Sequence, residues 1–341
     1  MIKFPFLTLK KPSGKTVGID IGNYNLKIVE IEKKSNSSMI TAAIMKRINS
    51  PDELPKLIKD TLKQANISAK KANISVSGEN VVARYLSLPK MSDDELKKAM
   101  VYTLEDHIPF KPEDVYTDFR ILNQEKDDTT RMTVFLVATK KDLVNSRAKL
   151  ILDAGLEPEV VTVDALALMQ LFYNNYPDKE KTNIALLNIG DKFTNVLICQ
   201  NHFPYFVRDA HFGGDIITNL IQTKLESDKK TAEELKFNLK NAPEDITQVI
   251  KSTFSNLLNE IFVSLDFYEN LTERRIDEVY IMGGSSQLEG LNDFLRGYLG
   301  MGIFNFEMLK NVTVSPKISS SELKSILPYI GVALGLALET P

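Results

Sequence analysis

The stretch VGIDIGNYNLKIVEI, residues 17–31, contains an apolar strand, a short polar turn and a second apolar strand. Asp20 stands near the end of the first strand, where a carboxylate is costly unless it meets a cation or hydrogen-bond donors. The turn after it, GNYN at residues 22–25, exposes successive backbone N–H groups of the kind that bind anions. The stretch predicts a β-hairpin that binds a phosphate with its cation. An ordinary hairpin with a polar turn is an equal alternative from this stretch alone.

A second stretch, IALLNIGDKFTNVLIC at residues 184–199, repeats the pattern. Asn188 and Gly190 stand where Asp20 and Gly22 stand, 168 positions later in the chain. This spacing is too long for a solenoid repeat and suits two homologous half-domains. We therefore expect two similar α/β halves, whose hairpin turns clamp one phosphate chain from opposite sides of a cleft.

Two further patterns suit the rest of a nucleotide. In TAEELKFNL, Glu233 and Lys236 lie three positions apart on one helical face and could straddle a ribose, although a solvated ion pair is the commoner meaning of such spacing. In VYIMGGSSQLEG, an apolar strand runs into Gly283 and Gly284 before a helix, which lets a base or a phosphate approach the backbone closely.

In this order the motifs resemble those of the actin-like ATPase superfamily, over residues 17–338. HFGGDIIT, residues 211–218, also resembles the glycine turn that this superfamily brings near the nucleotide. The resemblance implies an α/β, actin-like (ribonuclease H-like) two-domain ATPase fold that binds ATP or ADP with Mg²⁺. It implies water-mediated Mg²⁺ contacts from Asp20 and Asn188. The nucleotide-binding residues that it implies are Asp20, Gly22, Asn23, Tyr24, Asn25, Lys27, Gly190, Asp191, Lys192, Thr194, Gly213, Gly214, Glu233, Lys236, Gly283, Gly284 and Ser285.

One residue departs from the superfamily pattern. Asn188 stands where the second phosphate motif usually has aspartate. An amide can accept hydrogen bonds from metal-bound water, but it is neutral and holds Mg²⁺ or an attacking water less well. We therefore expect slow or absent ATP hydrolysis, and we assign no catalytic residue.

Between the two hairpins lies a separate pattern. Pro89 ends an alternating strand, Ser92 precedes a helix with Glu95 three places later, and Pro109 ends that helix. The strands VYTDFRIL and RMTVFLVATK, joined by the polar NQEKDDTT, then predict a hairpin, followed by the helix KDLVNSRAKLILDAG and the strand EPEVVTV. The pattern predicts an inserted α+β subdomain of four strands and two helices.

The place of this insertion resembles that of the relocated subdomain in the division protein FtsA and the type IV pilus assembly PilM family. Residues 85–122 resemble the PilM family closely. The expected boundaries are a tail at 1–14, a first actin-like subdomain at 15–85 plus 161–180, the inserted subdomain at 86–160, a second actin-like subdomain at 181–222 plus 274–341, and a helical subdomain at 223–273.

The resemblance implies a cytoplasmic scaffold of type IV pilus assembly that reaches the inner membrane through a partner, whose cytoplasmic N-terminal tail (PilN-like) it binds. An extended tail can add to the edge of the inserted sheet. Phe110, in EDHIPF, is predicted to lie near that groove. Self-association through the inserted unit is the alternative. Two other functions stay open: an FtsA-like polymerising protein, and a sugar-kinase-like phosphotransferase, for which the sequence shows no clear carboxylate base.

Composition excludes several classes. The 341 residues are 43% hydrophobic and carry a formal charge of −3, with both signs mixed along the chain, so nucleic acid is not an expected partner. The single cysteine, Cys199, excludes an internal disulfide and suits a reducing compartment. SGKT at 13–16 is not a P-loop, because Leu9 stands where its first glycine is required.

Overall fold

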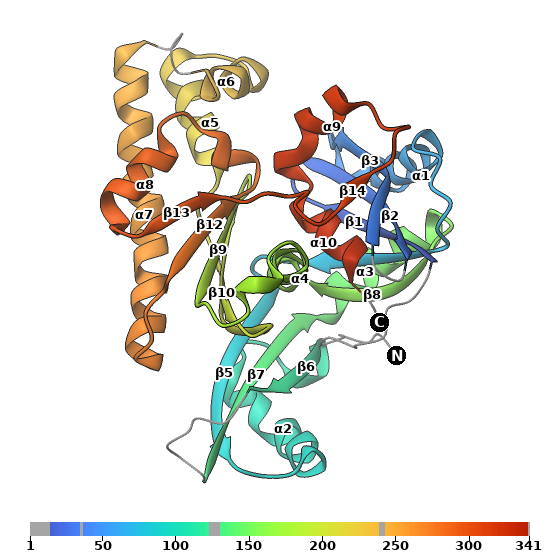
Figure 1. The fold of residues 1–341 in the computed structure, drawn as a ribbon, viewed down its shortest axis with the longest axis vertical. Helices are drawn as coiled ribbons and strands as arrows, with labels where there is room; N and C mark the ends of the chain where they lie inside the picture. Colours follow the sequence, from blue (N-terminus) through green and yellow to red (C-terminus); the bar gives the residue numbers. More distant parts are fainter. Residues whose placement is uncertain (1–13, 35–36, 123–129, 239–242, 340–341) are drawn as a thin grey trace.

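The first hairpin forms as predicted. Strand β1 (Gly14–Ile21) pairs antiparallel with β2 (Asn25–Lys34), and the register sets Asp20 opposite Lys27. The computed structural model that shows this arrangement describes residues 14–34, 37–122, 130–238 and 243–339 (Figure 1). The predicted tail spans residues 1–14; residues 1–13 lie outside the described residues, as does most of the polar tip NQEKDDTT, and Gly14 begins β1.

The first hairpin belongs to a six-stranded sheet with the order β14-β3-β2-β1-β4-β8. Its remaining strands are β3 (Ser37–Arg47), β4 (Lys71–Val76), β8 (Glu157–Val163) and β14 (Thr313–Val314). β2 runs antiparallel to both of its neighbours, whereas the β1–β4, β4–β8 and β14–β3 pairs are parallel. Parallel strands are usually buried on both faces, and the apolar residues of β1 and β4 lie in the core accordingly.

The second hairpin belongs to a five-stranded sheet with the order β11-β10-β9-β12-β13. Its strands are β9 (Ile184–Ile189), β10 (Thr194–Gln200), β11 (Phe203–Ala210), β12 (Glu278–Met282) and β13 (Gly302–Asn305). The order repeats β3-β2-β1-β4-β8, with antiparallel pairs on one side of the first strand and parallel pairs on the other. The predicted duplication of an α/β half is confirmed.

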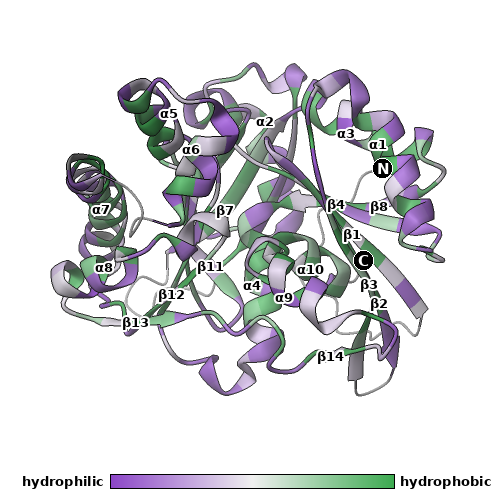
Figure 2. Cartoon of the chain, turned by 90° about the horizontal axis from the view of Figure 1, so that it is seen from above, coloured by the Kyte–Doolittle hydropathy of each residue, from purple (hydrophilic) through white to green (hydrophobic). Residues whose placement is uncertain are grey.

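Two helices pack between the sheets at the centre of the molecule. Helix α10 (Gly331–Leu338) lies against β1 and against α4 (Asp164–Asn175), and α4 also contacts β10 and β11 (Figure 2). Two glycines permit this close packing: a Cβ on Gly18 would lie 2.0 Å from the carbonyl oxygen of Ala333, and one on Gly335 would lie 2.0 Å from that of Ala167. Helices α1 (Leu54–Gln64) and α3 (Lys141–Asp153) cover the other face of the first sheet.

The second lobe has its own core. The outer face of the five-stranded sheet packs against α5 (Gly214–Leu225), α7 (Glu244–Thr272) and α8 (Leu291–Leu299), with α6 (Lys229–Lys236) beside α5. Helix α9 (Ser320–Ile326) lies near β3 in the first lobe. The 3₁₀ turns are η1 (Pro51–Glu53), η2 (Pro112–Asp114), η3 (Pro177–Lys179), η5 (Gly284–Gln287) and η6 (Leu327–Tyr329).

The inserted unit is a third sheet with the order β5-β7-β6, formed by β5 (Val81–Pro89), β6 (Val115–Ile121) and β7 (Arg131–Lys140). Helix α2 (Asp93–His107) packs on one face through Leu96 and Leu104. The predicted cap is present, because the Glu95 N–H donates to Ser92 Oγ at 3.4 Å and the Ser92 N–H donates to Glu95 Oε2 at 2.8 Å.

The structure differs from the expected boundaries in two places. Strand β8, expected as the fourth strand of the insertion, instead pairs parallel with β4, and α3 packs beside it. The segment 274–341 was expected wholly in the second half. Its first part, with β12, α8 and β13, lies there, but its last part returns to the first lobe: β14 pairs with β3, and α10 lies under β1. The apolar sequence GVALGLAL has no polar face, and all its residues are buried, in the space between β1 and α4.

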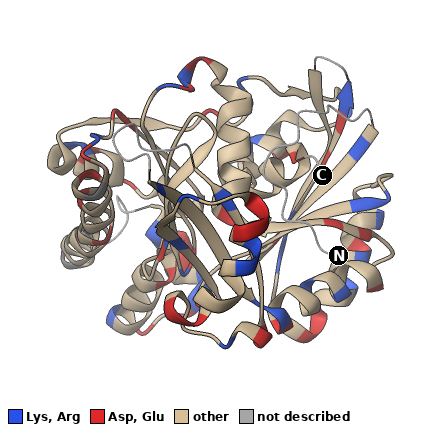
Figure 3. Ribbon diagram, turned by 90° about the horizontal axis from the view of Figure 1, so that it is seen from below, with Lys and Arg blue, Asp and Glu red and all other residues tan. Residues whose placement is uncertain are grey.

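Charge is mixed over the surface. Figure 3 shows acidic and basic residues interspersed along the helices seen from below. Within the described residues, no single helix is long and apolar enough to cross a membrane; one pair, Ser320–Tyr329 and Gly331–Leu338, reaches that length and composition only together, and it is bent by 93°.

Candidate functional site

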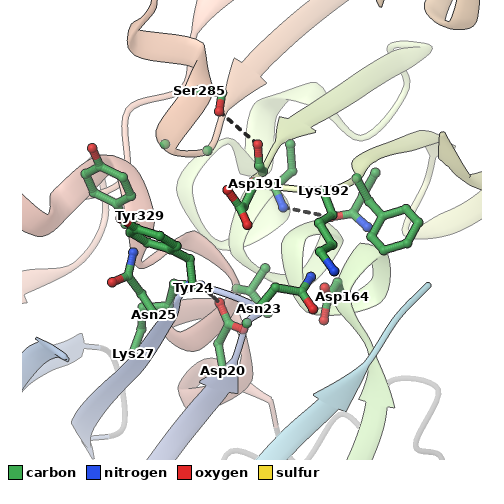
Figure 4. Close-up of a pocket in the computed structure, with 18 of the residues that line it drawn as sticks. Asp20, Asn23, Tyr24, Asn25, Lys27, Asp164, Asp191, Lys192, Ser285 and Tyr329 are labelled. Carbon is green, nitrogen blue, oxygen red and sulfur yellow. Dashed lines mark hydrogen bonds and ion pairs between the residues drawn. The ribbon is translucent and has the colours of Figure 1, made fainter. Parts of the chain in front are cut away.

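The two hairpin turns face one another across a cavity of about 320 Å³ between the lobes (Figure 4). This volume lies within the range of small-molecule sites. The β1–β2 turn, the β9–β10 turn, α6 and η5 all contribute to its lining. The sequence-predicted residues that line it are Asp20, Gly22, Asn23, Tyr24, Asn25, Lys27, Asn188, Gly190, Asp191, Lys192, Glu233, Lys236, Gly283, Gly284 and Ser285.

The first hairpin brings a charged pair to the cavity. Lys27 Nζ lies 2.9 Å from Asp20 Oδ2, and Asp20 is 8% exposed. The turn closes through a hydrogen bond from the Gly22 N–H to the carbonyl of Asn25 at 3.1 Å. A Cβ on Gly22 would lie 2.7 Å from Lys27 Nζ, so glycine leaves the lysine room to reach the cavity. This hairpin therefore offers a carboxylate for a cation and an ammonium for a phosphate.

The second hairpin brings a neutral pair to the opposite wall. Asn188 Nδ2 donates to Asn195 Oδ1 at 2.7 Å, and Asn195 Nδ2 donates to Asp209 Oδ1 at 2.7 Å. The other oxygen of Asp209 accepts the Gly78 N–H at 2.7 Å, which links the second lobe to the loop between β4 and β5. Gly283, with φ +93°, allows this arrangement, because a Cβ there would lie 2.6 Å from Asn188 Oδ1.

Three predicted residues, Thr194, Gly213 and Gly214, do not line the cavity. The Gly214 N–H donates to the Gly190 carbonyl at 3.0 Å, and a Cβ on Gly213 would lie 2.0 Å from the Asp191 oxygen. Thr194 Oγ1 donates to the Phe212 carbonyl at 2.8 Å. These residues support the second turn from behind. The first N–H groups of α5, those of Gly214 and Asp215, already donate to the carbonyls of Gly190 and Asp191 in the turn. These N–H groups are therefore not available to a phosphate.

The two residues of the predicted ribose pair, Glu233 and Lys236, have different surroundings. Lys236 is 2% exposed, and its Nζ donates to the Gly214 carbonyl at 3.2 Å, to Thr218 Oγ1 at 3.0 Å and to Glu233 Oε1 at 2.8 Å. The lysine thus holds α6 against α5 and has no donor left for a ligand. Glu233, which lines the cavity and is only partly buried, is the member of the pair that can meet a sugar hydroxyl.

Asp164, the first residue of α4, lines the same cavity and was not predicted. Burial raises the pKa of its carboxyl to about 6, and the negative charge of Asp20 adds to this rise, whereas hydrogen bonds from Ser75 and Ser77 lower the pKa. One signal for it exists in the sequence, because VTVDA places an acid directly after an apolar strand, as VGIDI does. The carboxyl ends of parallel strands share one edge of a sheet, where ligands commonly bind.

The charges around the cavity suit a nucleotide bound with a cation. Four carboxylates and three lysines line the wall: Asp20, Asp164, Asp191, Glu233, Lys27, Lys192 and Lys236. A triphosphate alone would add its charge to this excess of acid, whereas Mg²⁺ would offset it. Within the described residues, no group of three or more histidine, cysteine or acidic side chains could hold a metal. A bound Mg²⁺ would therefore take further ligands from the phosphates.

Two aromatic side chains, Tyr329 and Phe237, also line the cavity. A Cβ on Gly284 would lie 2.4 Å from Tyr329 Cε1, so the tyrosine ring rests directly on the glycine backbone. Ser285 Oγ donates to the Gly190 carbonyl at 2.8 Å, which ties η5 to the second turn. Aromatic rings of this kind fit a planar base. Tyr329 and Phe237 were not predicted, since nothing in their local sequence marks them.

A second cavity, of about 230 Å³, adjoins the first and shares Ser77, Asp164 and Phe193 with it. Four consecutive residues of β5, residues 81–84, and three consecutive residues of β11, residues 207–209, line it. Side chains alternate between the two faces of a strand. A cavity that is lined by consecutive residues of a strand therefore lies along the edge of that strand. Both strands are edge strands of their sheets. Val137, Val163 and Ala165 add further apolar lining.

Phe110, predicted near a partner groove, does not line this cavity. Its ring packs against the core of the inserted sheet, and Lys140 Nζ lies 5.1 Å from its centre.

Comparison with known proteins gives a consistent result. The family model described as type IV pilus assembly protein PilM matches residues 18–341. A chain of the solved PilM-PilN type IV pilus biogenesis complex is 26% identical, with a TM-score of 0.84 over 96% of this chain and 98% of that one. The ethanolamine utilization protein EutJ from Carboxydothermus hydrogenoformans is 12% identical, with a TM-score of 0.56 over 96% and 90%. Component A of (R)-2-hydroxyglutaryl-CoA dehydratase from Acidaminococcus fermentans is 13% identical, with a TM-score of 0.50 over 96% and 97%. These last two similarities show the fold alone.

Proposed function

The chain belongs to the type IV pilus assembly protein PilM family, and from this premise we propose that it is an actin-like, ATP-binding scaffold that holds the cytoplasmic N-terminal tail of a PilN-like inner-membrane protein. One observation supports both parts of the proposal: two adjoining cavities share Asp164 and Ser77. The first is bounded by charged and glycine-rich turns, and the second by two strand edges.

ATP or ADP with Mg²⁺ is the ligand proposed for the first cavity. Asp20 and Lys27 would meet the metal and the phosphates, Glu233 the ribose, and the aromatic rings of Phe237 and Tyr329 the base. Calorimetric titration of the protein with ATP, with and without Mg²⁺, tests this. We expect saturable binding that weakens when Mg²⁺ is removed, and no binding under either condition would contradict the assignment.

The tail is proposed to bind in the second cavity as an added strand. The Lys140 N–H donates to the Asn80 carbonyl. In an antiparallel pair every second residue is hydrogen-bonded to the partner strand, so the even-numbered residues of β5 direct their N–H and C=O groups to β7. The N–H of Ala83 therefore turns to the free edge. An extended peptide gains affinity from such main-chain groups and specificity from the apolar pocket beside them. The chemistry expected of the tail is an extended, largely apolar segment.

Titration of a labelled peptide of the partner's N-terminal tail tests this placement. Ala83→Pro removes the edge donor without removing a bond to β7, and Val207→Asp places a charge in the cavity wall; both should abolish or strongly weaken binding. Val101→Asp is the matched control, since Val101 is 63% exposed on α2. Phe110→Ala, the substitution favoured by the sequence, should have the smaller effect because Phe110 lies outside the cavity. Full binding by Ala83→Pro and Val207→Asp would contradict this placement.

We also propose that hydrolysis is slow or absent and that ATP acts as a structural ligand, since the second hairpin has the amide of Asn188 at the position where the first has the carboxylate of Asp20. A sugar-kinase-like transferase is the second candidate, and one observation favours it: the carboxylate of Asp164 lies between the two cavities. Phosphate release measured with and without the tail peptide, and with small hydroxylated acceptors, separates these functions. Acceptor-dependent turnover would favour the transferase.

The proposed location is the cytoplasmic side of the inner membrane, reached through the partner. Binding to the tail would supply that attachment. Co-sedimentation with vesicles that carry the membrane-anchored tail tests it, with vesicles that lack the tail as the control. Equal sedimentation with both would contradict attachment through the partner.

A further inference from the structure

We propose that Tyr24 is a latch that closes the mouth of the nucleotide cavity by joining the two lobes. This inference rests on the proposed nucleotide binding. The ring of Tyr24 meets a cation from each lobe: Arg47 Cζ lies 4.5 Å from its centre, and Lys229 Nζ lies 4.7 Å from it. Tyr24 also lines the cavity, so the same ring bounds the ligand space and bridges the lobes.

The two sides of this contact have different anchors. Tyr24 is fixed to the first lobe, because its carbonyl accepts the Ile48 N–H at 2.9 Å and Arg47 is the last residue of β3. Lys229 is the first residue of α6, whose N-terminus is capped by Asp228 accepting the Thr231 N–H at 2.8 Å. Arg47 therefore orients the ring, and Lys229 supplies the contact across the cleft.

A contact of this kind acts on the rates of exchange. A cation over an aromatic face at a partly exposed site contributes roughly 0.5 to 1 kcal/mol, or more where water is excluded. Because the Tyr24 ring bounds the ligand space and contacts Lys229 of the other lobe, a nucleotide that enters or leaves past this ring must displace the contact. Loss of the latch should therefore speed association and dissociation together, each by about fivefold, and change the dissociation constant much less.

Stopped-flow fluorescence with N-methylanthraniloyl-ATP measures both rates. We expect Tyr24→Ala and Lys229→Met to accelerate association and dissociation to the same extent, and the double variant to be no faster than either single one. Tyr24→Phe, which keeps the ring, should restore slow exchange relative to Tyr24→Ala. Lys230→Met is the matched control, because this neighbouring lysine is exposed and faces Glu234 at 4.0 Å; it should leave both rates unchanged.

Three results would overturn the latch. Faster dissociation alone, with a weaker dissociation constant, would make Tyr24 or Lys229 a direct ligand contact. Additive effects in the double variant would show that the two residues act separately. Unchanged rates in both single variants would show that the contact does not limit exchange. Wild-type protein that gave no signal with the analogue at any concentration would instead contradict the proposed nucleotide binding, and the latch with it.

Discussion

The two hairpins that face the cavity share a backbone and differ in charge. Asp20 and Lys27 occupy opposed positions in the first, and Asn188 and Asn195 occupy the same positions in the second. The first pair is an ion pair at 2.9 Å, and the second is an amide hydrogen bond at 2.7 Å. The repeated fold therefore fixes where four side chains meet the ligand, while the chemistry at each position is free to diverge.

The difference also gives the two walls different connections. The ion pair of the first hairpin ends at the cavity, where its charges are available to a metal and to phosphates. The amide pair of the second hairpin continues through Asp209 to the backbone of Gly78, at the start of the loop that leads into β5. One wall is suited to binding, and the other is suited to holding the inserted sheet in a fixed relation to the site.

The largest expected effect concerns the second acid of the first lobe, Asp164. Its pKa is raised to about 6 in the folded protein from an ordinary value near 3.8, so the folded state holds this proton more tightly than the unfolded chain. The stability of the wild type should therefore fall as pH rises from about 4 through 6, by up to about 3 kcal/mol. Asp164→Asn has no carboxyl to ionise and lacks this loss. Its free energy of unfolding relative to wild type should therefore increase over the same pH range. Urea unfolding at several pH values measures it.

The exposed Asp142→Asn on α3 is the control for that experiment. It removes a carboxylate from the same lobe without changing the cavity. A difference between wild type and Asp164→Asn that stayed constant from pH 4 to 8 would show that the carboxyl is not strained by its surroundings.

The next effect compares the hairpins directly. Lys27→Ala removes the cation that pairs with Asp20 and leaves the cavity one charge more negative. A charge-assisted contact contributes roughly 1.5 to 3 kcal/mol, so affinity for ATP should fall about ten- to a hundredfold. Asn195→Ala, the matched change in the other hairpin, should lower it by less than about threefold. Equal losses in calorimetry would show that the two walls contribute alike.

These comparisons also show what the sequence can and cannot reveal. Both hairpins, the capped helix after Ser92 and the strand before Gly283 are contiguous patterns, and each forms as predicted. Residues that join the site from distant segments were missed: Asp164 arrives at the start of α4, and Tyr329 arrives in η6. VTVDA marks Asp164 as an acid after a strand, but its place in this cavity depends on the pairing of β8 with β4, and the place of Tyr329 depends on how the last helices pack. Local spacing encodes neither.

The boundary correction at β8 and the changed role of Lys236 have the same cause. Strand β8 reads as a good strand, but whether it pairs with β4 or with the inserted sheet depends on partners far away in the chain. Lys236 lies on the predicted helix, yet its role changes because α5 brings the Gly214 carbonyl and Thr218 to its ammonium group. The sequence predicts which side chains share a helical face. It does not predict which side chains and carbonyls of other elements will surround them.

A smaller effect is expected when charge is added to the second wall. Asn188→Asp restores a carboxylate that can hold a metal-bound water, so phosphate release should rise severalfold from its low value. The introduced carboxylate must also compete with Asp209 for the amide of Asn195, which limits the gain. Asn188→Ala is the control, because it removes the amide without adding charge. Brisk hydrolysis by the wild type, with no gain in Asn188→Asp, would show that the neutral side chain at position 188 does not limit hydrolysis.

The smallest effect tests whether the second wall connects to the tail site. Asn195→Ala removes the amide between Asn188 and Asp209, so the carboxylate loses one of its two donors while keeping the Gly78 N–H. A hydrogen bond contributes roughly 1 kcal/mol, and only part of this loss would reach the loop before β5, so tail affinity should fall about two- to fivefold. Asn259→Ala, on the exposed side of α7, is the control. If Asn195→Ala lowers tail affinity more than ATP affinity, the second hairpin is connected to the tail site through Asp209. If tail affinity is unchanged, the two hairpins differ in charge alone.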